Sequence, residues 1–198
     1  MYVFHMSRSH IRHLAYSGIC LSLCLVLPFL TGQIPQIGSA LCPMHLPVLL
    51  AGYLCGPWWA ASVGAIAPLL RYALFGMPPI FPTGLAMCFE LLTYGLISGL
   101  LYQRLPKKTV NIYTSLIAAM LSGRIIWGCA QVILLGLSGS AFSWSAFLAG
   151  AFANAIPGIV VQIIFLPMLV LSLQKTGAIP APALKYSYRR DSRVTKRI

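Results

Sequence analysis

Three charged residues lie inside long apolar runs of this sequence: Arg71, Glu90 and Arg124. A charge at bilayer depth costs at least ~2.5 kcal/mol on insertion scales, so it usually faces a partner or a cavity and marks function. Glu90 is one of only two acidic residues, against 14 lysines and arginines. A carboxylate and guanidinium groups in apolar surroundings can bind the polar groups of a small ligand, or they can neutralise each other.

Aromatic and polar side chains share helix faces with these charges. Tyr94 follows Glu90 by four residues, which places both on one face of a helix. Trp127 and Gln131 follow Arg124 by three and seven residues, again on one face. Polar groups with aromatic neighbours inside an apolar bundle are typical of a small-ligand pocket.

Three of the polar residues are predicted to lie at one depth, in the outer half of the membrane. At ~1.5 Å of rise per residue, Glu90 lies about 10 Å and Asn154 about 12 Å into helices that enter from outside. Arg124 lies near the middle of a helix that ends outside, and Arg71 lies near the outer end of its helix. The common depth, and not any single residue, carries the prediction of a site.

The same residues also have structural interpretations, which the sequence leaves open. Glu90 and Arg124 can form an ion pair that only neutralises two buried charges. Arg71 can extend its charged group to the outer interface of the membrane. Asn154 and Gln162 can join neighbouring helices by hydrogen bonds.

The elements that must position these residues are predicted from apolar runs. Hydrophobic residues make up 59% of the 198 residues and the mean hydropathy is +0.84, which excludes an ordinary soluble domain. Runs of roughly 20 apolar residues can each cross a bilayer. We therefore predict an all-α integral membrane bundle of about six helices. The predicted spans are residues 14–31, 45–56, 58–75, 83–103, 110–136 and 146–173.

Two of these spans leave alternatives open. The span 45–56 is short, and only Gly56-Pro57 separates it from the next, so five spans with a re-entrant segment is the competing count. The run 14–31 follows Arg8 and Arg12, as in a signal peptide. It lacks a small-x-small cleavage site, so we interpret it as a retained first helix.

Basic residues predict the orientation of the bundle. We divide the chain into an N-terminal segment 1–13, a transmembrane domain 14–173 and a basic tail 174–198. Lysines and arginines lie in both terminal segments and at 104–109, whereas 32–44 and 137–145 carry no charge. By the positive-inside rule both termini are predicted to be cytoplasmic in the cell membrane. The net charge of +12 then favours anionic membrane lipid as a partner, and not nucleic acid.

The sequence lacks the motifs of several kinds of enzyme and metal site. The six cysteines show no CxxC or Cys/His metal spacing, and most lie in spans, so we expect no metal site. The chain has no Walker A, HExxH or GxSxG motif, and therefore no visible ATPase or protease machinery. We expect no cofactor in this chain.

Two further features point to binding. In the first span Gly18 and Ser22 are four residues apart, as are Cys20 and Cys24, a spacing that lets helices approach closely. These residues can face a transmembrane partner or pack internally. The segments 32–44 and 75–82 are uncharged and rich in glycine and proline. They can cap a cavity from outside, or simply rest on the membrane surface.

Several stretches resemble the substrate-specific S components of energy-coupling factor (ECF) vitamin transporters. The best-matching stretch, from Cys42 to Arg71, reads CPMHLPVLLAGYLCGPWWAASVGAIAPLLR. FGMPPIFPTGLAMCFELLTYGLISGLLY is similar to the third loop and fourth helix of that family, and NAIPGIVVQ to its sixth helix. The likeness covers roughly residues 12–173.

The resemblance implies a six-helix bundle that binds one vitamin near its outer face. It also implies partners: a transmembrane coupling subunit and two ATPase subunits that use ATP. Small residues of the first helix contact the coupling subunit in that family, which here points to Gly18/Ser22 or Cys20/Cys24. By position, the resemblance implicates these residues in substrate binding: His45, Arg71, Glu90, Arg124, Trp127 and Asn154. Tyr94 joins them from its spacing to Glu90.

Two other functions remain open at this point. One is a small intramembrane enzyme that uses Glu90 or His45 as a general base, although no nucleophile or metal constellation accompanies them. The other is a membrane scaffold without transport, in which the polar residues only join helices and His45 is an ordinary interfacial residue. For a transporter, two arginines against one glutamate favour an anionic vitamin, provided that Arg71, Glu90 and Arg124 all face the cavity.

Overall fold

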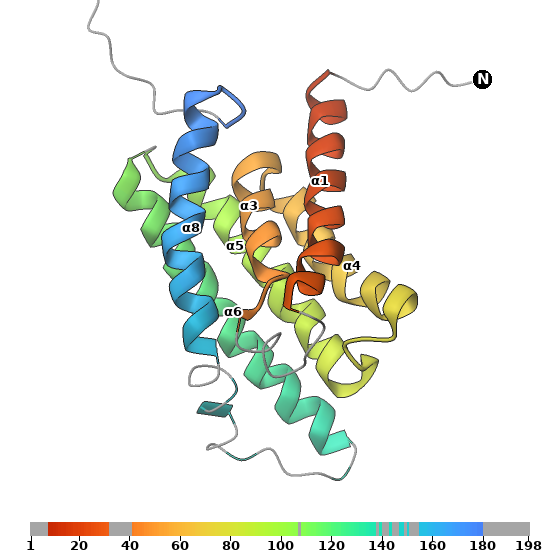
Figure 1. The fold of residues 1–198 in the computed structure, drawn as a ribbon. Coiled ribbons are helices and arrows are strands. Elements are labelled where there is room, and N and C mark those ends of the chain that lie inside the picture. Colours follow the sequence, from red (N-terminus) through yellow and green to blue (C-terminus); the bar gives the residue numbers. More distant parts are fainter. Residues whose placement is uncertain are drawn as a thin grey trace, which may run out of the picture.

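The computed structural model describes residues 8–31, 41–106, 108–137, 139, 143, 147, 148, 150 and 155–179. Over these residues the protein is all-helical. Six long helices alternate in direction along the bundle (Figure 1). They are α1 (Arg8–Val26), α3 (His45–Cys55), α4 (Pro57–Phe75), α5 (Leu85–Arg104), α6 (Thr109–Leu137) and α8 (Ile156–Lys175). Two short helical turns, η1 (Leu27–Thr31) and η2 (Ile80–Gly84), follow α1 and precede α5.

Helix α5 is the centre of the bundle. It packs against α3, α4 and α6, while α1 covers α3 and α4, and α8 covers α3 and α6. Glycines let the helices approach α5 closely: a Cβ at Gly64 of α4 would collide with the backbone of Leu91, and one at Gly95 with the backbone of Ala60. Such close contact is typical of packing between membrane helices.

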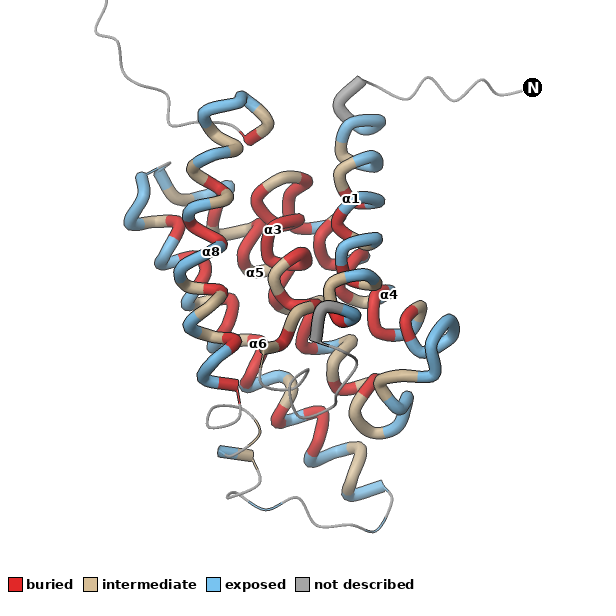
Figure 2. Tube along the Cα trace, in the orientation of Figure 1, coloured by how far each residue is buried: buried red, intermediate tan, exposed pale blue. Residues whose placement is uncertain are grey.

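Buried residues line the inner faces of the helices, and exposed residues line the outer faces (Figure 2). Many of the exposed residues are large and apolar, including Ile125, Ile133 and Ile164, each more than half exposed. A soluble protein rarely leaves so much apolar surface in contact with water. This surface fits a protein surrounded by lipid.

Within the described residues, four helical segments are long and apolar enough to cross a membrane: His10–Phe29, Ile80–Arg104, Thr109–Leu137 and Ile156–Lys175. Helix α3 has 11 residues, so its length is about 16 Å, well short of a bilayer. Helix α4 has 19 residues, but Pro68 and Arg71 interrupt its apolar run. The predicted short span at 45–56 is confirmed as a short helix, whereas six full crossings are not confirmed.

The predicted helix limits are mostly close to the observed ones, with exceptions at the two ends of the bundle. Helix α1 begins at Arg8 and includes the basic residues that we had placed before the span 14–31. Helix α8 begins at Ile156, ten residues later than the predicted span 146–173, with Pro157 in its first turn. Proline is tolerated there because its missing N–H would be unpaired anyway. Gly56, with φ of +85°, and Pro57 form the tight turn between α3 and α4.

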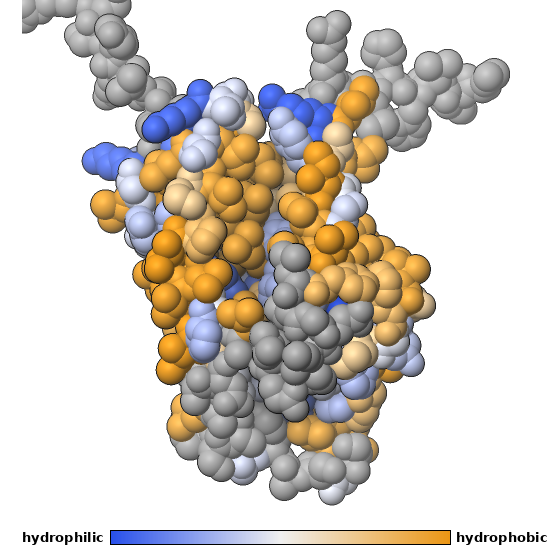
Figure 3. Space-filling view, viewed as in Figure 1, coloured by the Kyte–Doolittle hydropathy of each residue, from blue (hydrophilic) through white to orange (hydrophobic). Residues whose placement is uncertain are grey.

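The polar ends of the helices gather at one end of the bundle. The start of α1, the α5–α6 connection and the end of α8 lie at this end (Figure 1). Hydrophilic residues cluster there, above a broad apolar belt (Figure 3). The described basic residues at these helix ends therefore share one side of the bundle, and the tail 180–198 lies outside the described residues.

Candidate functional site

Glu90 is the centre of a buried group of polar side chains. It lies on α5 and is 1% exposed. Arg124 of α6 places Nη1 3.0 Å from Glu90 Oε1, and His45, at the start of α3, places Nε2 3.3 Å from the same oxygen. Three helices therefore each bring one ionisable side chain to a single carboxylate.

Close packing of α6 on α5 makes this arrangement possible. A Cβ at Gly123 would collide with the ring of Tyr94 and would crowd the backbone carbonyl of Glu90. Glycine at that position lets the next residue, Arg124, reach the carboxylate. Tyr94, one turn after Glu90, is fully buried, and its ring meets the His45 ring edge-on with centroids 5.2 Å apart.

Cys42 completes the group, although the sequence analysis did not single it out. Arg124 Nη2 donates to its Sγ at 3.5 Å. Cys42 has φ of +47°, a left-handed conformation that non-glycine residues adopt rarely and often at functional sites. We refer to Cys42, His45, Glu90, Tyr94 and Arg124 as the polar cluster.

The polar cluster contains more hydrogen-bonding capacity than its members use. Among the described residues, two buried nitrogens of the cluster, His45 Nδ1 and Arg124 Nε, have no hydrogen-bond or ion-pair partner. Glu90 Oε1, His45 Nε2 and Tyr94 Oη lack a hydrogen bond of good geometry, but Glu90 is a neighbour of both other groups. A buried polar group without a partner costs about 1–3 kcal/mol. A bound ligand with donor and acceptor groups would therefore gain free energy by satisfying them.

Gln131 and Gln162 are also buried, and each has an amide oxygen without a hydrogen bond among the described residues. Gln131 lies on the same face of α6 as Arg124, as predicted. Gln162 lies on α8, which packs on α3 and α6.

Arg71 lies in different surroundings. Its Nη1 donates to the backbone carbonyl of Leu25 at 2.8 Å, and its guanidinium lies over the rings of Phe29 and Phe75 at 5.4 and 5.5 Å. Only 4% of the residue is exposed, so it does not extend into solvent. In the described part of the chain Arg71 joins α4 to the end of α1, and no contact places it in the polar cluster.

Two other predicted site residues are not seen in the polar cluster. Trp127 stacks on Phe147, with ring centroids 6.4 Å apart and an angle of 28° between the planes. Asn154 lies outside the described residues. The ligand-binding roles of Arg71, Trp127 and Asn154 stay predictions.

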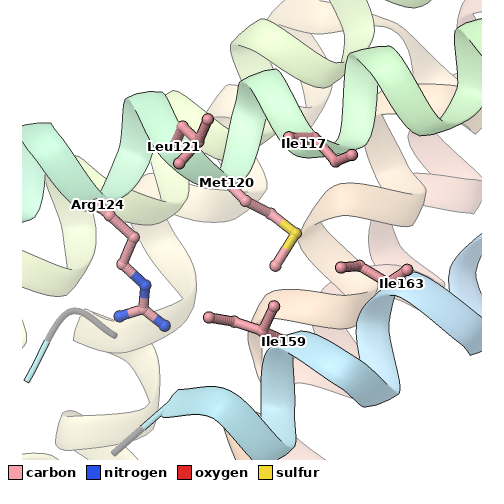
Figure 4. Close-up of a pocket in the computed structure, with 6 residues that line it drawn as sticks. All are labelled: Ile117, Met120, Leu121, Arg124, Ile159 and Ile163. Atoms are coloured by element: carbon pink, nitrogen blue, oxygen red, sulfur yellow. The ribbon is translucent and has the colours of Figure 1, made fainter. Parts of the chain in front are cut away.

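An apolar groove between α6 and α8 begins at Arg124 (Figure 4). Its volume is about 160 Å³. Side chains of both helices line it: Ile117, Met120, Leu121 and Arg124 from α6, and Ile159 and Ile163 from α8. Arg124 thus belongs both to the polar cluster and to the wall of the groove.

The structure separates the two small-residue pairs of α1. Cys20 and Cys24 are buried, and Cys24 Sγ donates to the carbonyl of Met44 at 3.6 Å. Gly18 and Ser22 are exposed, and no described atom lies within 4 Å of a Cβ built on Gly18. The cysteine pair therefore packs inside the described bundle, and Gly18 and Ser22 lie on its exposed surface. The coupling roles of both pairs stay predictions.

The chain is thus an integral membrane protein, a helical bundle with a buried polar cluster and an apolar outer surface. A family model described as "ECF transporter, substrate-specific component" matches residues 12–170. The match covers most of the 198 residues, so the chain belongs to the family of substrate-specific components of ECF transporters. No curated protein and no solved structure gives a significant match.

Proposed function

We propose that this protein is the subunit that captures a vitamin or related micronutrient for an ATP-driven importer. Membership of the family supports a substrate-specific subunit of a membrane transporter. The observation that carries the proposal further is the polar cluster, in which three helices bring ionisable side chains to one buried carboxylate, and His45 Nδ1 and Arg124 Nε have no partner among the described residues. Unpaired buried polar atoms in a native structure need an explanation, and a bound ligand would provide one.

The proposal includes partners that supply energy. ECF substrate-specific components work with a membrane coupling subunit and ATPase subunits. We expect one coupling subunit and two ATPase subunits here, with ATP bound by the latter. The exposed Gly18 and Ser22 on α1 are the candidate contact with the coupling subunit. Both termini would then lie in the cytoplasm, where anionic lipid attracts the basic end segments.

An intramembrane enzyme is the less supported alternative. Glu90 Oε1 already contacts both Arg124 and His45, so it is not an unpaired carboxylate that could serve as a general base. No described serine is positioned with His45 as a nucleophile and base would be. A scaffold without transport is also less supported, because joined helices would satisfy their own polar groups.

The arrangement of charges changes the expected ligand. The preference for an anionic vitamin assumed that Arg71, Glu90 and Arg124 face one cavity. Instead Glu90 pairs with Arg124, and Arg71 contacts Leu25 and two aromatic rings. The excess of positive charge is absent from the polar cluster, so we now expect a ligand that offers both donors and acceptors, whatever its net charge.

The experiment that tests this function is identification of the ligand. The protein would be purified in detergent, and extracted small molecules would be identified by mass spectrometry. In parallel, a panel of vitamins and their precursors would be tested for binding by calorimetry. We expect one compound to bind tightly without chemical change. Turnover of a compound would favour the enzyme, and a folded protein that binds none of them would favour the scaffold.

A further inference from the structure

Gln162 lies on the inward face of α8 and is almost completely buried. The buried residues of this helix recur at helical spacing along one inner stripe: Gly158, Gln162, Leu166, Pro167 and Val170. Gln162 is 2% exposed, whereas Ile164, two residues later, is 59% exposed. The Gln162 amide therefore points into the bundle and is shielded from the surroundings of the protein.

The amide oxygen of Gln162 has no hydrogen-bond partner among the described residues. Burying an amide oxygen without a hydrogen bond is costly, so such an atom needs an explanation. The other end of α8 shows how a glutamine joins two helices: Gln174 Nε2 donates to Tyr102 Oη of α5 at 2.7 Å. The Gln162 oxygen takes part in no such contact within the described part of the chain.

Gln162 lies at the level of the polar cluster in the bundle. Its neighbours on α8, Ile159 and Ile163, lie across from Arg124 of α6 in the wall of the same groove (Figure 4). Helix α8 also packs on α3, which begins at His45. Arg124 and His45 belong to the polar cluster, so at this level the inward face of α8 adjoins the helices that carry it.

We infer that Gln162 is a further ligand-binding residue, whose amide oxygen accepts a hydrogen bond from an N–H or O–H group of the transported compound. An ionised carboxylate only accepts hydrogen bonds and cannot satisfy this oxygen. The group that meets Gln162 is therefore an amine, an amide or a hydroxyl. With α3, α5 and α6, helix α8 becomes the fourth to supply a polar side chain to the site. This inference rests on the proposed function, because it adds a residue to the same site.

The stability of the ligand-free protein distinguishes a binding residue from one that joins helices. Gln162→Leu replaces the unpaired amide by an apolar side chain of similar size, so we expect it to melt about 2–10 °C above wild type. Gln174→Leu is the matched control, because the same substitution on the same helix removes an existing hydrogen bond. We expect Gln174→Leu to melt below wild type. Bound ligand would be removed first, since it raises the melting temperature by itself.

Ligand binding should change in the opposite sense. The probes are the panel of vitamins and precursors, measured by calorimetry, and analogues of the bound compound in which single N–H or O–H donors are replaced by C–H. We expect Gln162→Leu to lose at least tenfold in affinity for the bound compound, and Gln174→Leu to keep wild-type affinity. One analogue should bind wild type at least tenfold more weakly and bind Gln162→Leu no more weakly than wild type, because the contact that it lacks is already absent.

A second variant, Gln162→Met, keeps the test decisive if leucine packs poorly at this position. Methionine is unbranched like glutamine and has no amide. We expect the same rise in melting temperature and the same loss of affinity as in Gln162→Leu. Every variant must elute as a single symmetric peak with wild-type helical content before its binding is compared.

The contrary results separate this inference from the proposed function. Folded Gln162 variants that melt at or below wild type, or failure of both variants to fold, show that the amide stabilises the bundle and overturn the inference. Unchanged affinity in a folded Gln162 variant overturns it as well. All these results leave the proposed function standing, provided that wild type binds a compound without turnover. A wild-type protein that binds no member of the panel overturns the proposed function, and this inference with it.

Discussion

At the scale of residues, one carboxylate with two possible partners is the central feature. Glu90 Oε1 lies 3.0 Å from Arg124 Nη1 and 3.3 Å from His45 Nε2, and all three residues are buried. Removing one partner of a buried ion pair typically costs 3–5 kcal/mol, whereas replacing both is often nearly neutral. Loss of either partner of Glu90 should therefore lower the stability of the protein more than loss of the whole pair.

Substitution of Arg124 should separate stability from binding. In Arg124→Gln, Glu90 keeps only His45, so we expect a lower melting temperature. The double variant Glu90→Gln/Arg124→Gln should recover part of the lost melting temperature, because neither charge of the pair remains. We also expect Arg124→Gln to weaken ligand binding by roughly 1.5–3 kcal/mol, the range for a charge-assisted hydrogen bond.

Thermal unfolding in detergent and calorimetry with the identified ligand measure these two effects. Lys108→Gln is a suitable control, since Lys108 is exposed at the polar end of the bundle. Unchanged affinity in a folded Arg124→Gln protein would show that the ligand does not reach this side chain.

At the scale of elements, Arg71 connects α4 to the end of α1. Its hydrogen bond to the Leu25 carbonyl and its contacts with Phe29 and Phe75 hold η1 against α4. We expect Arg71→Gln to destabilise the protein by about 1.5–3 kcal/mol, because a charged hydrogen bond and two cation–π contacts are lost.

Ligand affinity should change less in Arg71→Gln than in Arg124→Gln. Thermal unfolding and calorimetry of both variants under the same conditions would test this difference. An affinity loss in Arg71→Gln equal to that in Arg124→Gln would indicate that Arg71 belongs to the ligand site.

Helix α1 has a buried pair of small residues, Cys20 and Cys24, and an exposed pair, Gly18 and Ser22. Substitution by a bulky side chain should have different effects at the two pairs. Cys24→Trp should disturb the fold, since Cys24 is 0% exposed and in the core. Gly18→Trp should fold and bind ligand normally, because space surrounds Gly18, but should abolish uptake if this row meets the coupling subunit.

Radiolabelled uptake in cells that contain the complete transporter, and ligand binding by the isolated subunit, measure the two properties of α1. Ile164→Trp on the lipid-facing side of α8 is the matched control. Normal uptake in Gly18→Trp would exclude this row as the contact.

Sequence patterns predicted the helices better than they predicted which side chains contact each other. The turn between α3 and α4 was predictable because Gly56 and Pro57 end and begin helices. The start of α8 was missed because the apolar composition continues before Ile156, and hydropathy alone does not mark a helix end. The Glu90–Arg124 pair was one of two open interpretations, since a shared depth does not fix the facing sides of helices. Cys42 was missed because its contact with Arg124 spans 82 residues and cysteine usually acts as a small apolar residue.

At the scale of the whole molecule, charge and apolar surface define how the bundle sits in a membrane. The starts and ends of helices that carry basic residues lie at one end, and on the face seen in Figure 3 a broad apolar belt lies below them. From the positive-inside rule we predict that this end lies in the cytoplasm. The polar cluster then lies toward the opposite side, since Glu90 is in the first turns of α5, far from the α5–α6 connection.

This orientation predicts which positions can be labelled from outside intact cells. Single cysteines would be introduced at positions 38 and 190 in a background without the six native cysteines. We expect a membrane-impermeant maleimide to modify position 38 in intact cells and position 190 only after the cells are opened, because basic segments stay on the cytoplasmic side. Uptake by each variant would first confirm that the protein folds and inserts normally. Labelling of position 190 in intact cells would show that the orientation is the reverse of the predicted one. The polar cluster would then lie on the cytoplasmic side, where it could not capture a ligand from outside.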